Sequence, residues 1–151
     1  MSHNILISLT LPCNQARAWK AIADWEAQGN WMLQSKVWVT SEIREGVGTS
    51  IAAFTGPFYK RYPRFSKVGL LDTMVVTNWQ PPSRCDVLHT GKVLKGTGTF
   101  ELVEISQDAT RFNWSEDIEC SRLQFLAIYP FLWIGVRISL ARLSASLRAP
   151  E

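Results

Sequence analysis

The sequence predicts an α+β fold in which one antiparallel sheet packs against a single long helix near the C-terminus. Short stretches with strand-like alternation follow one another from residue 37 to residue 119, and no helix-length segment separates them. Strands joined in this way pair antiparallel, because a parallel connection needs a crossover of a dozen or more residues. The longest segment without a turn signal, 121–147, then supplies the helix. We expect about seven strands in all, with two short helices after the first.

The chain has the length and composition of a single folded domain, 1–151. Apolar residues make up 46% of it and aromatic residues 11%, which excludes a disordered chain. Three cysteines and two histidines without a CxxC pair predict free thiols, no metal site and no cofactor. The N-terminus lacks the features of a secretory signal, so we expect a cytoplasmic protein.

The first strand is expected over 4–11, where isoleucine and leucine alternate with polar residues. Asn14 is suited to cap a helix over 15–23, because its side chain can accept a hydrogen bond from the first turn. A second short helix is expected over 25–30. Three tryptophans fall in or beside these helices, and they indicate core packing, since indoles bury large areas.

Strand alternation places three polar residues, Asp72, His89 and Glu116, among apolar neighbours. The remaining strands are expected over 37–44, 49–55, 68–79, 84–94, 96–105 and 110–119, with a hairpin at 45–48 and a turn at 107–108. The side chains that share the face of His89 are Cys85, Val87 and Val93. Asp72 lies on a strand that is apolar on both faces, so the inward side of that strand stays open.

The segment 121–147 carries no charge over 125–136. Twelve residues are too few for a bilayer, which needs ~20. A helix that is apolar on nearly every side is normally buried within its own domain, so we expect the sheet to enclose it. Pro130 and Gly135 predict a bend near its middle.

Three short motifs carry a resemblance to a known superfamily that extends over nearly the whole chain. They are Trp19-x-x-Ile22-x-Asp24 leading to Trp31, Gly46-x-Gly48 between strands, and Trp79-Gln80-Pro81-Pro82-Ser83-Arg84 before Val87-Leu88-His89. In this order they resemble the helix-grip fold of the START-related or SRPBCC superfamily, the polyketide cyclase/dehydrase and lipid-transport group. The resemblance implies a curved sheet wrapped around the C-terminal helix, with a deep cavity for a hydrophobic small molecule such as a lipid, isoprenoid or polyketide. The enzymes of this superfamily differ in their catalytic residues, so none is carried over.

Four polar residues could orient the head of such a ligand, namely Asp72, His89, Glu116 and Arg137. Apolar side chains expected to enclose its body are Phe112, Trp114, Phe125, Tyr129, Leu132 and Trp133. As an alternative, His89 or Glu116 could be the base of a polyketide cyclase or dehydratase. A second alternative is a structural or interaction domain with a filled core. In the simplest case His89 is a core histidine and Glu116 pairs with Arg137.

The segment from Pro57 to Lys67 carries four basic residues, four aromatic residues and no acid, and its charge exceeds the net +3 of the chain. Two prolines and the lack of periodicity predict a loop. The loop could lie solvated on the sheet, cover the cavity as a lid, or make weak contact with an anionic membrane surface. The residues expected to do so are Phe58, Tyr59, Lys60, Arg61, Tyr62, Arg64 and Phe65. Nucleic acid ranks last as a partner, because only this short segment is basic. The oligomeric state stays open.

Overall fold

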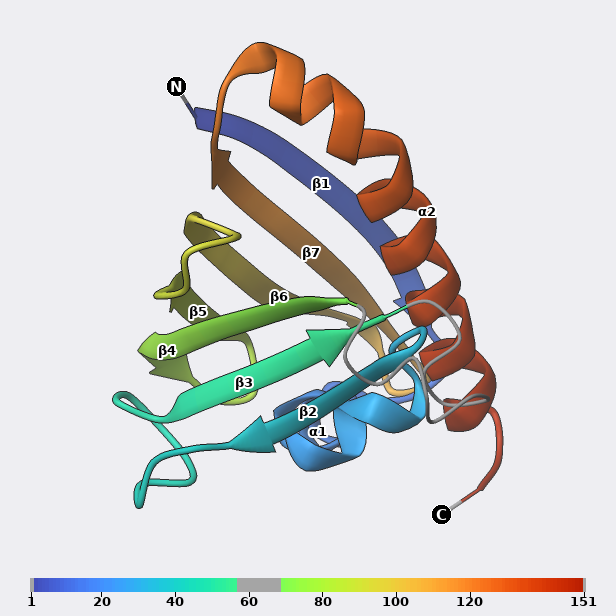
Figure 1. Cartoon of the computed structure of the whole chain (residues 1–151). Helices are drawn as coiled ribbons and strands as arrows, with labels where there is room; N and C mark the ends of the chain where they lie inside the picture. The colour runs from blue at the N-terminus through green and yellow to red at the C-terminus, as the bar shows by residue number, and fades with distance from the viewer. Residues whose placement is uncertain (1, 57–68, 151) are drawn as a thin grey trace.

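The computed structural model describes residues 2–56 and 69–150, and within them one antiparallel sheet of seven strands packs against a long helix (Figure 1). The strands are β1 (Ser2–Leu11), β2 (Ser35–Val39), β3 (Ser50–Thr55), β4 (Leu70–Gln80), β5 (Arg84–His89), β6 (Gly96–Ser106) and β7 (Ala109–Glu119). Their order across the sheet is β1-β7-β6-β5-β4-β3-β2. The helices are α1 (Gln15–Ala23), the 3₁₀ helix η1 (Glu26–Asn30) and α2 (Arg122–Leu147). The expected α+β helix-grip architecture is confirmed.

Both α-helices begin with the side-chain caps that their sequences provide. The Asn14 side chain accepts a hydrogen bond of 2.8 Å from the backbone N–H of Arg17. At the start of α2, the Ser121 hydroxyl accepts from the N–H of Gln124, and the Gln124 side chain accepts from the N–H of Ser121. The helix then continues through Pro130, and its axis curves along the sheet (Figure 1).

The strand β5 ends at His89, five residues earlier than expected. Thr90 donates its backbone N–H to the carbonyl of Thr73, and a turn follows at Gly91. Val93, expected beside His89 on the apolar face, therefore lies in this turn and is 64% exposed. The strand β2 is also shorter than expected.

A β-bulge in β4 explains why both faces of this strand look apolar in the sequence. The pairing with β5 shifts between Val76 and Asn78, and the extra residue moves the inward face by one position. Asp72 lies inward before the bulge. Beyond it Trp79 points to the same side, where its ring lies 5.0 Å from that of Trp19. The open question about this strand is thereby settled.

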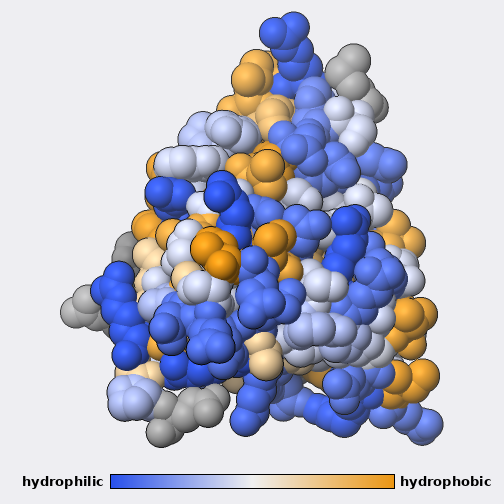
Figure 2. Space-filling model, turned by 180° about the vertical axis from the view of Figure 1, so that it is seen from behind, coloured by the Kyte–Doolittle hydropathy of each residue, from blue (hydrophilic) through white to orange (hydrophobic). Residues whose placement is uncertain are grey.

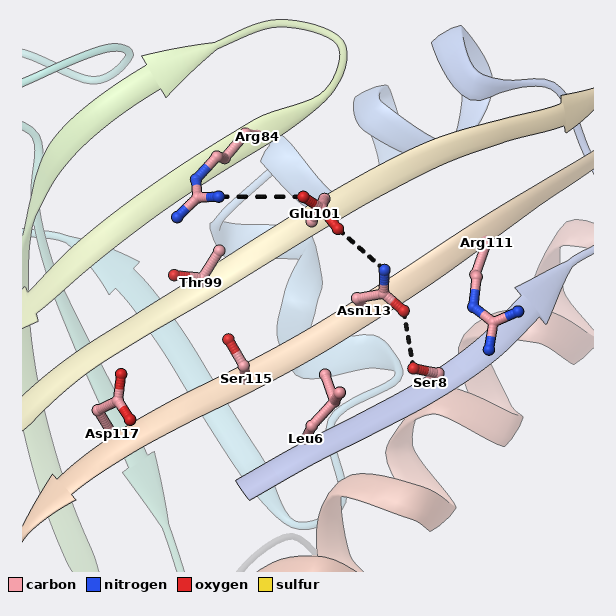
Figure 3. Close-up of a pocket in the computed structure, with 9 residues that line it drawn as sticks. All are labelled: Leu6, Ser8, Arg84, Thr99, Glu101, Arg111, Asn113, Ser115 and Asp117. Atoms are coloured by element: carbon pink, nitrogen blue, oxygen red, sulfur yellow. Dashed lines mark hydrogen bonds and ion pairs between the residues drawn. The ribbon is translucent and has the colours of Figure 1, made fainter. Parts of the chain in front are cut away.

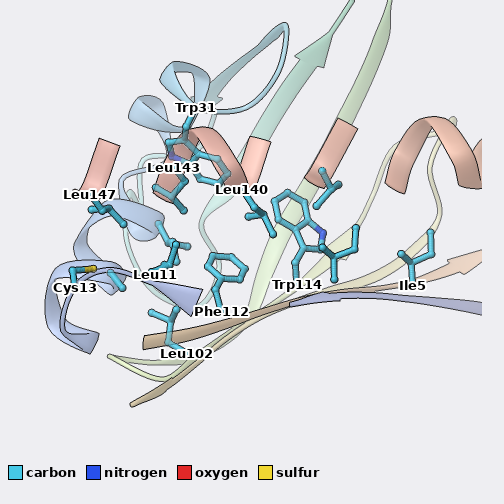
Figure 4. Packing of buried hydrophobic residues seen from close by; sticks show 14 of the residues in the cluster. Ile5, Leu11, Cys13, Trp31, Leu102, Phe112, Trp114, Leu140, Leu143 and Leu147 are labelled. Carbon is cyan, nitrogen blue, oxygen red and sulfur yellow. The ribbon is translucent and has the colours of Figure 1, made fainter. Parts of the chain in front are cut away.

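The main core lies between the concave face of the sheet and the second half of α2 (Figure 4). Leu140 and Leu143 are each 1% exposed and pack with Phe112, which is fully buried. Other members of this core are Ile5, Ile7, Leu11, Leu102, Trp114, Val136 and Leu147. A second cluster, toward the β2 side of the sheet, includes Trp25, Val37, Ile51, Val76, Cys85 and Val87. The α2 residues of the first cluster therefore pack the second half of this helix against the sheet.

The first half of α2 is not buried on every side, which corrects the expectation from the sequence. The exposed apolar side chains on this helix are Leu123, Leu126, Ile128, Tyr129, Phe131, Trp133, Ile134 and Ile138. By length and hydropathy the helix could cross a membrane, and only 17% of its most apolar 18-residue window is buried. The expectation that the segment is too short for a bilayer counted only the twelve charge-free residues 125–136, whereas the helix has 26 residues. Because α2 packs on the sheet with one face only, none of the other described helices and strands covers its outer face.

The three cysteines are free thiols, as expected, and Cys13 and Cys85 are buried. Burial, with a further contribution from the charge of Asp86, raises the pKa of Cys85 to about 12. Since only a thiolate reacts, we expect iodoacetamide at about pH 8 to label the partly exposed Cys120 but not Cys85 in the folded protein. Peptide mass spectrometry measures this, with the urea-denatured chain as the control in which both react. Equal labelling of both in the folded protein would contradict the burial of β5.

Candidate functional site

Asp72, His89 and Glu116 meet on the concave face of the sheet, and we call them the charge cluster. His89 Nδ1 lies 2.9 Å from Asp72 Oδ1, and His89 Nε2 lies 2.9 Å from Glu116 Oε2. The side chain of His89 is 2% exposed, and those of Asp72 and Glu116 are 14% and 10% exposed. Three candidates from separate strands, β4, β5 and β7, therefore form one buried group.

The reach of Glu116 toward β5 depends on a glycine in the strand between them. The residue opposite Glu116 on β6 is Gly98. A Cβ atom at this position would lie 2.9 Å from Glu116 Oε2, closer than real Cβ contacts. Glycine thus leaves the space through which the carboxylate crosses β6 to reach His89. The indole Nε1 of Trp114 holds the other oxygen of Glu116 with a hydrogen bond of 3.0 Å.

The charge cluster keeps His89 protonated at neutral pH. Burial, the largest single influence, disfavours the charged ring and acts to lower its pKa. The hydrogen bonds to Asp72 and Glu116, together with the negative charges of these carboxylates, outweigh burial and raise the pKa of His89 to about 10. Both ring nitrogens then donate hydrogen bonds, one to each carboxylate.

Two contacts between α2 and β1 show which part of the helix lies beside the charge cluster. The ring of Phe125 stacks on His3 with centroids 4.5 Å apart, and Arg137 donates to the carbonyl oxygen of Ser8 at 3.4 Å. Between these points β1 carries Ile5, which pairs with Glu116 of β7. The part of α2 between Phe125 and Arg137 is therefore level with the cluster.

The apolar candidates divide into buried and partly exposed side chains. Phe112 and Trp114 lie within the core, and Phe125 and Leu132 pack against it. Tyr129 and Trp133 are 38% and 39% exposed, and they lie on the same half of the helix. The structure thus brings the six expected residues onto the concave face of the sheet and the helix that covers it.

Arg137 does not join the charge cluster, and the pairing with Glu116 considered for it is not formed. Its guanidinium lies 5.8 Å from the ring centroid of Trp133 and points to the edge of β1. The reason is helical geometry, because Arg137 follows the buried Val136 and is turned from the concave face toward the edge of the sheet. The expected lid or membrane loop, residues 57–67, lies outside the described residues.

The face of the sheet opposite the charge cluster carries an open depression of about 480 Å³ (Figure 3). Its lining is polar, and the side chains bond to one another across the strands, as Ser8 does to Asn113 and Asn113 to Glu101. Seen from behind, the molecule is mainly hydrophilic (Figure 2). Polar side chains that bond to one another in this way are typical of a solvated sheet face, and we do not assign the depression a ligand.

The sequence showed the polar candidates and Trp114, but it did not show that Gly98 and Trp114 position Glu116. Gly98 occupies an inward position on a strand, where a glycine often marks close approach by another group. That signal could have revealed the space beside Glu116. The hydrogen bond from Trp114 to Glu116 could not be anticipated, since it depends on the ring orientation.

Comparisons with known proteins show the fold of this chain. Models of protein families give no match to the sequence, and neither do the curated proteins. Among solved structures, a START superfamily protein from Mycobacterium smegmatis is similar with a TM-score of 0.76 and 10% identity, covering 97% of each chain. The Zhui aromatase/cyclase from Streptomyces sp. R1128 is similar with a TM-score of 0.67 and 10% identity, covering 97% of this chain and 92% of that one. A norcoclaurine synthase from Thalictrum flavum is similar with a TM-score of 0.69 and 11% identity, covering 97% and 94%.

Proposed function

Given the START-type helix-grip fold of the chain, we propose that it binds one hydrophobic small molecule between the sheet and the first half of α2. The charge cluster is the observation that carries this proposal. Burying three charged groups costs free energy, and apolar residues of similar size would commonly be as stable or more so. Their place on an otherwise apolar face supports a role in orienting a polar head, while the helix contacts an apolar body. A lipid, an isoprenoid or a polyketide has this chemistry.

The charge cluster supports binding in preference to catalysis by His89. A general base must accept a proton near neutral pH, but the pKa of His89 is raised to about 10, so it already carries that proton. Its two nitrogens are also occupied by carboxylates, which leaves neither directed at a substrate. The cyclase or dehydratase alternative therefore loses one of its two candidate bases, and Glu116 is the other. The free thiols agree with a reducing compartment such as the cytoplasm.

A bulky residue on the inner side of α2 should block binding. Leu132 packs toward the core, whereas Ala127 on the same helix is exposed. We expect Leu132→Trp to weaken binding of an apolar ligand by about tenfold or more, equivalent to about 1.4 kcal/mol, and Ala127→Trp to leave it unchanged. The shift in melting temperature on titrating a long-chain alcohol measures this, since a ligand that binds only the folded state stabilises it. Equal affinities in both variants would contradict the proposed site.

We also propose that the outer face of α2 makes weak contact with an anionic membrane surface. Leu123 and Phe131 are each 79% exposed, and Ile134 is 50% exposed. The helix contains three arginines and no acidic residue, so its charge suits anionic lipid and would repel a second copy of the same face. The second half of α2 is packed into the core of the domain, and insertion across the bilayer would remove it from that core. Contact with the membrane surface is therefore favoured.

Vesicle co-sedimentation tests this contact. We expect the protein to sediment with vesicles that contain phosphatidylserine more than with pure phosphatidylcholine, and less as salt rises. Phe131→Asp should reduce the bound fraction severalfold, because it places a charge in the apolar face. Leu6→Asp, a matched change at an exposed residue of β1, should have little effect. Absence of binding at low salt would remove this proposal, and a concentration-dependent dimer without lipid would assign the face to a second copy.

A further inference from the structure

The hydrogen-bonding capacity of the charge cluster is almost fully used within the protein. The two N–H groups of His89 point to Asp72 and Glu116. Both oxygens of Glu116 also have partners, since Oε2 accepts from His89 and Oε1 from Trp114. Of the four carboxylate oxygens, only Asp72 Oδ2 lacks a hydrogen bond to the described residues, and its side chain is 14% exposed. An ionised carboxylate oxygen can accept hydrogen bonds but cannot donate them.

The charge of the cluster also restricts which ligand head groups can lie beside it. One basic side chain, His89, lies between two acidic ones, Asp72 and Glu116, so acidic groups are in excess in the charge cluster. A second anion beside this group would be repelled, and the repulsion is stronger at a buried site than in water. Arg137 cannot offset it, because its guanidinium is at the outer edge of β1.

From this geometry we infer that the head group of the ligand donates a hydrogen bond to Asp72, as a hydroxyl or an amine does, and that carboxylate and phosphate heads are rejected. This inference rests on the proposed binding site and specifies the class of its ligand. It selects long-chain alcohols, phenols and amines, and it excludes free fatty acids.

A series of ligands with one tail and different heads tests the inference on the full chain. The probes are 1-dodecanol, dodecylamine, dodecanoate and 1-methoxydodecane, each competing with a fluorescent apolar probe. We expect the alcohol or the amine to bind at least about tenfold more tightly than dodecanoate, and than the methyl ether, which has no hydrogen to donate. Dodecanoate or the ether binding as tightly as both donors would overturn this inference and leave the proposed function intact. Failure of every compound to bind would count against the proposed function itself.

Asp72→Asn provides the matched change in the protein. Asparagine keeps the size of the side chain and can still accept from His89, but it replaces the available oxygen by an NH₂ donor. We expect the preference for dodecanol over dodecanoate to fall by about tenfold or more. Asp117→Asn, the same change on the outer face of β7, should leave the preference as in the wild type. An unchanged preference in folded Asp72→Asn would overturn the assignment of Asp72, and the wild-type series decides the matter if this variant does not fold.

Discussion

Raising the pH from 6.5 toward 10 is expected to reduce the advantage in stability that wild-type protein has over a His89→Gln variant. The pKa of His89 is raised from its usual 6.5 to about 10 in the folded state, so the folded state binds a proton that the unfolded chain has lost. The resulting stability is fully present below about pH 6.5 and is lost as pH rises through about 10. The free energy of unfolding should fall by up to about 1.4 kcal/mol per pH unit in this window.

Urea denaturation of both proteins across the window measures this effect. Lysine, tyrosine and cysteine titrate in both chains, so their contributions largely cancel in the difference. Near pH 6.5 we expect His89→Ala to be less stable than wild type by about 3–5 kcal/mol, because it leaves two buried carboxylates without their cation. Parallel pH profiles for wild type and His89→Gln would show that His89 is not held as an imidazolium.

Gly98→Ala is expected to destabilise the protein by about 3 kcal/mol, although alanine usually improves the interior of a strand. The new methyl group would lie 2.9 Å from Glu116 Oε2, so this oxygen must shift, and the shift weakens its buried hydrogen bond to His89. Gly135→Ala serves as the opposite control, since its Cβ would have no neighbour within 4 Å and should stabilise α2 by about 1 kcal/mol.

A double-mutant cycle assigns the cost at Gly98 to the collision with Glu116. In a Glu116→Ala background the methyl group meets no carboxylate, so Gly98→Ala should be almost neutral there. We expect a coupling energy of about 2–3 kcal/mol from chemical denaturation of the four proteins. Additive effects would mean that Gly98 is needed for the β6 backbone itself and not for the charge cluster.

The fold could be predicted from the sequence because its signals are local. Alternation marked the strands, and the cap at Asn14 indicated where the first helix begins. The same alternation placed His89 and Glu116 on inward faces. Alternation could not show that the side chains of His89 and Glu116 contact each other. That contact depends on the register that joins β5, β6 and β7, which is set by residues far apart in the chain.

Two features escaped the sequence for physical reasons. The inward side of Asp72 depends on a bulge in β4, and one extra residue reverses the alternation that a pattern relies on. The exposure of Phe131 and its neighbours was missed because apolar composition was equated with burial. Only the placement of α2 along β1 shows that the described residues leave half of an apolar helix exposed.

Native mass spectrometry of the purified protein, followed by organic extraction, tests the central claim most directly. The account predicts a one-to-one complex with an apolar molecule that carries a hydroxyl or an amine, and loss of this complex in Leu132→Trp but not in Ala127→Trp. A protein without a bound molecule, whose melting temperature is also unchanged by every long-chain alcohol and amine tried, would contradict it. The charge cluster would then be a structural feature of the sheet.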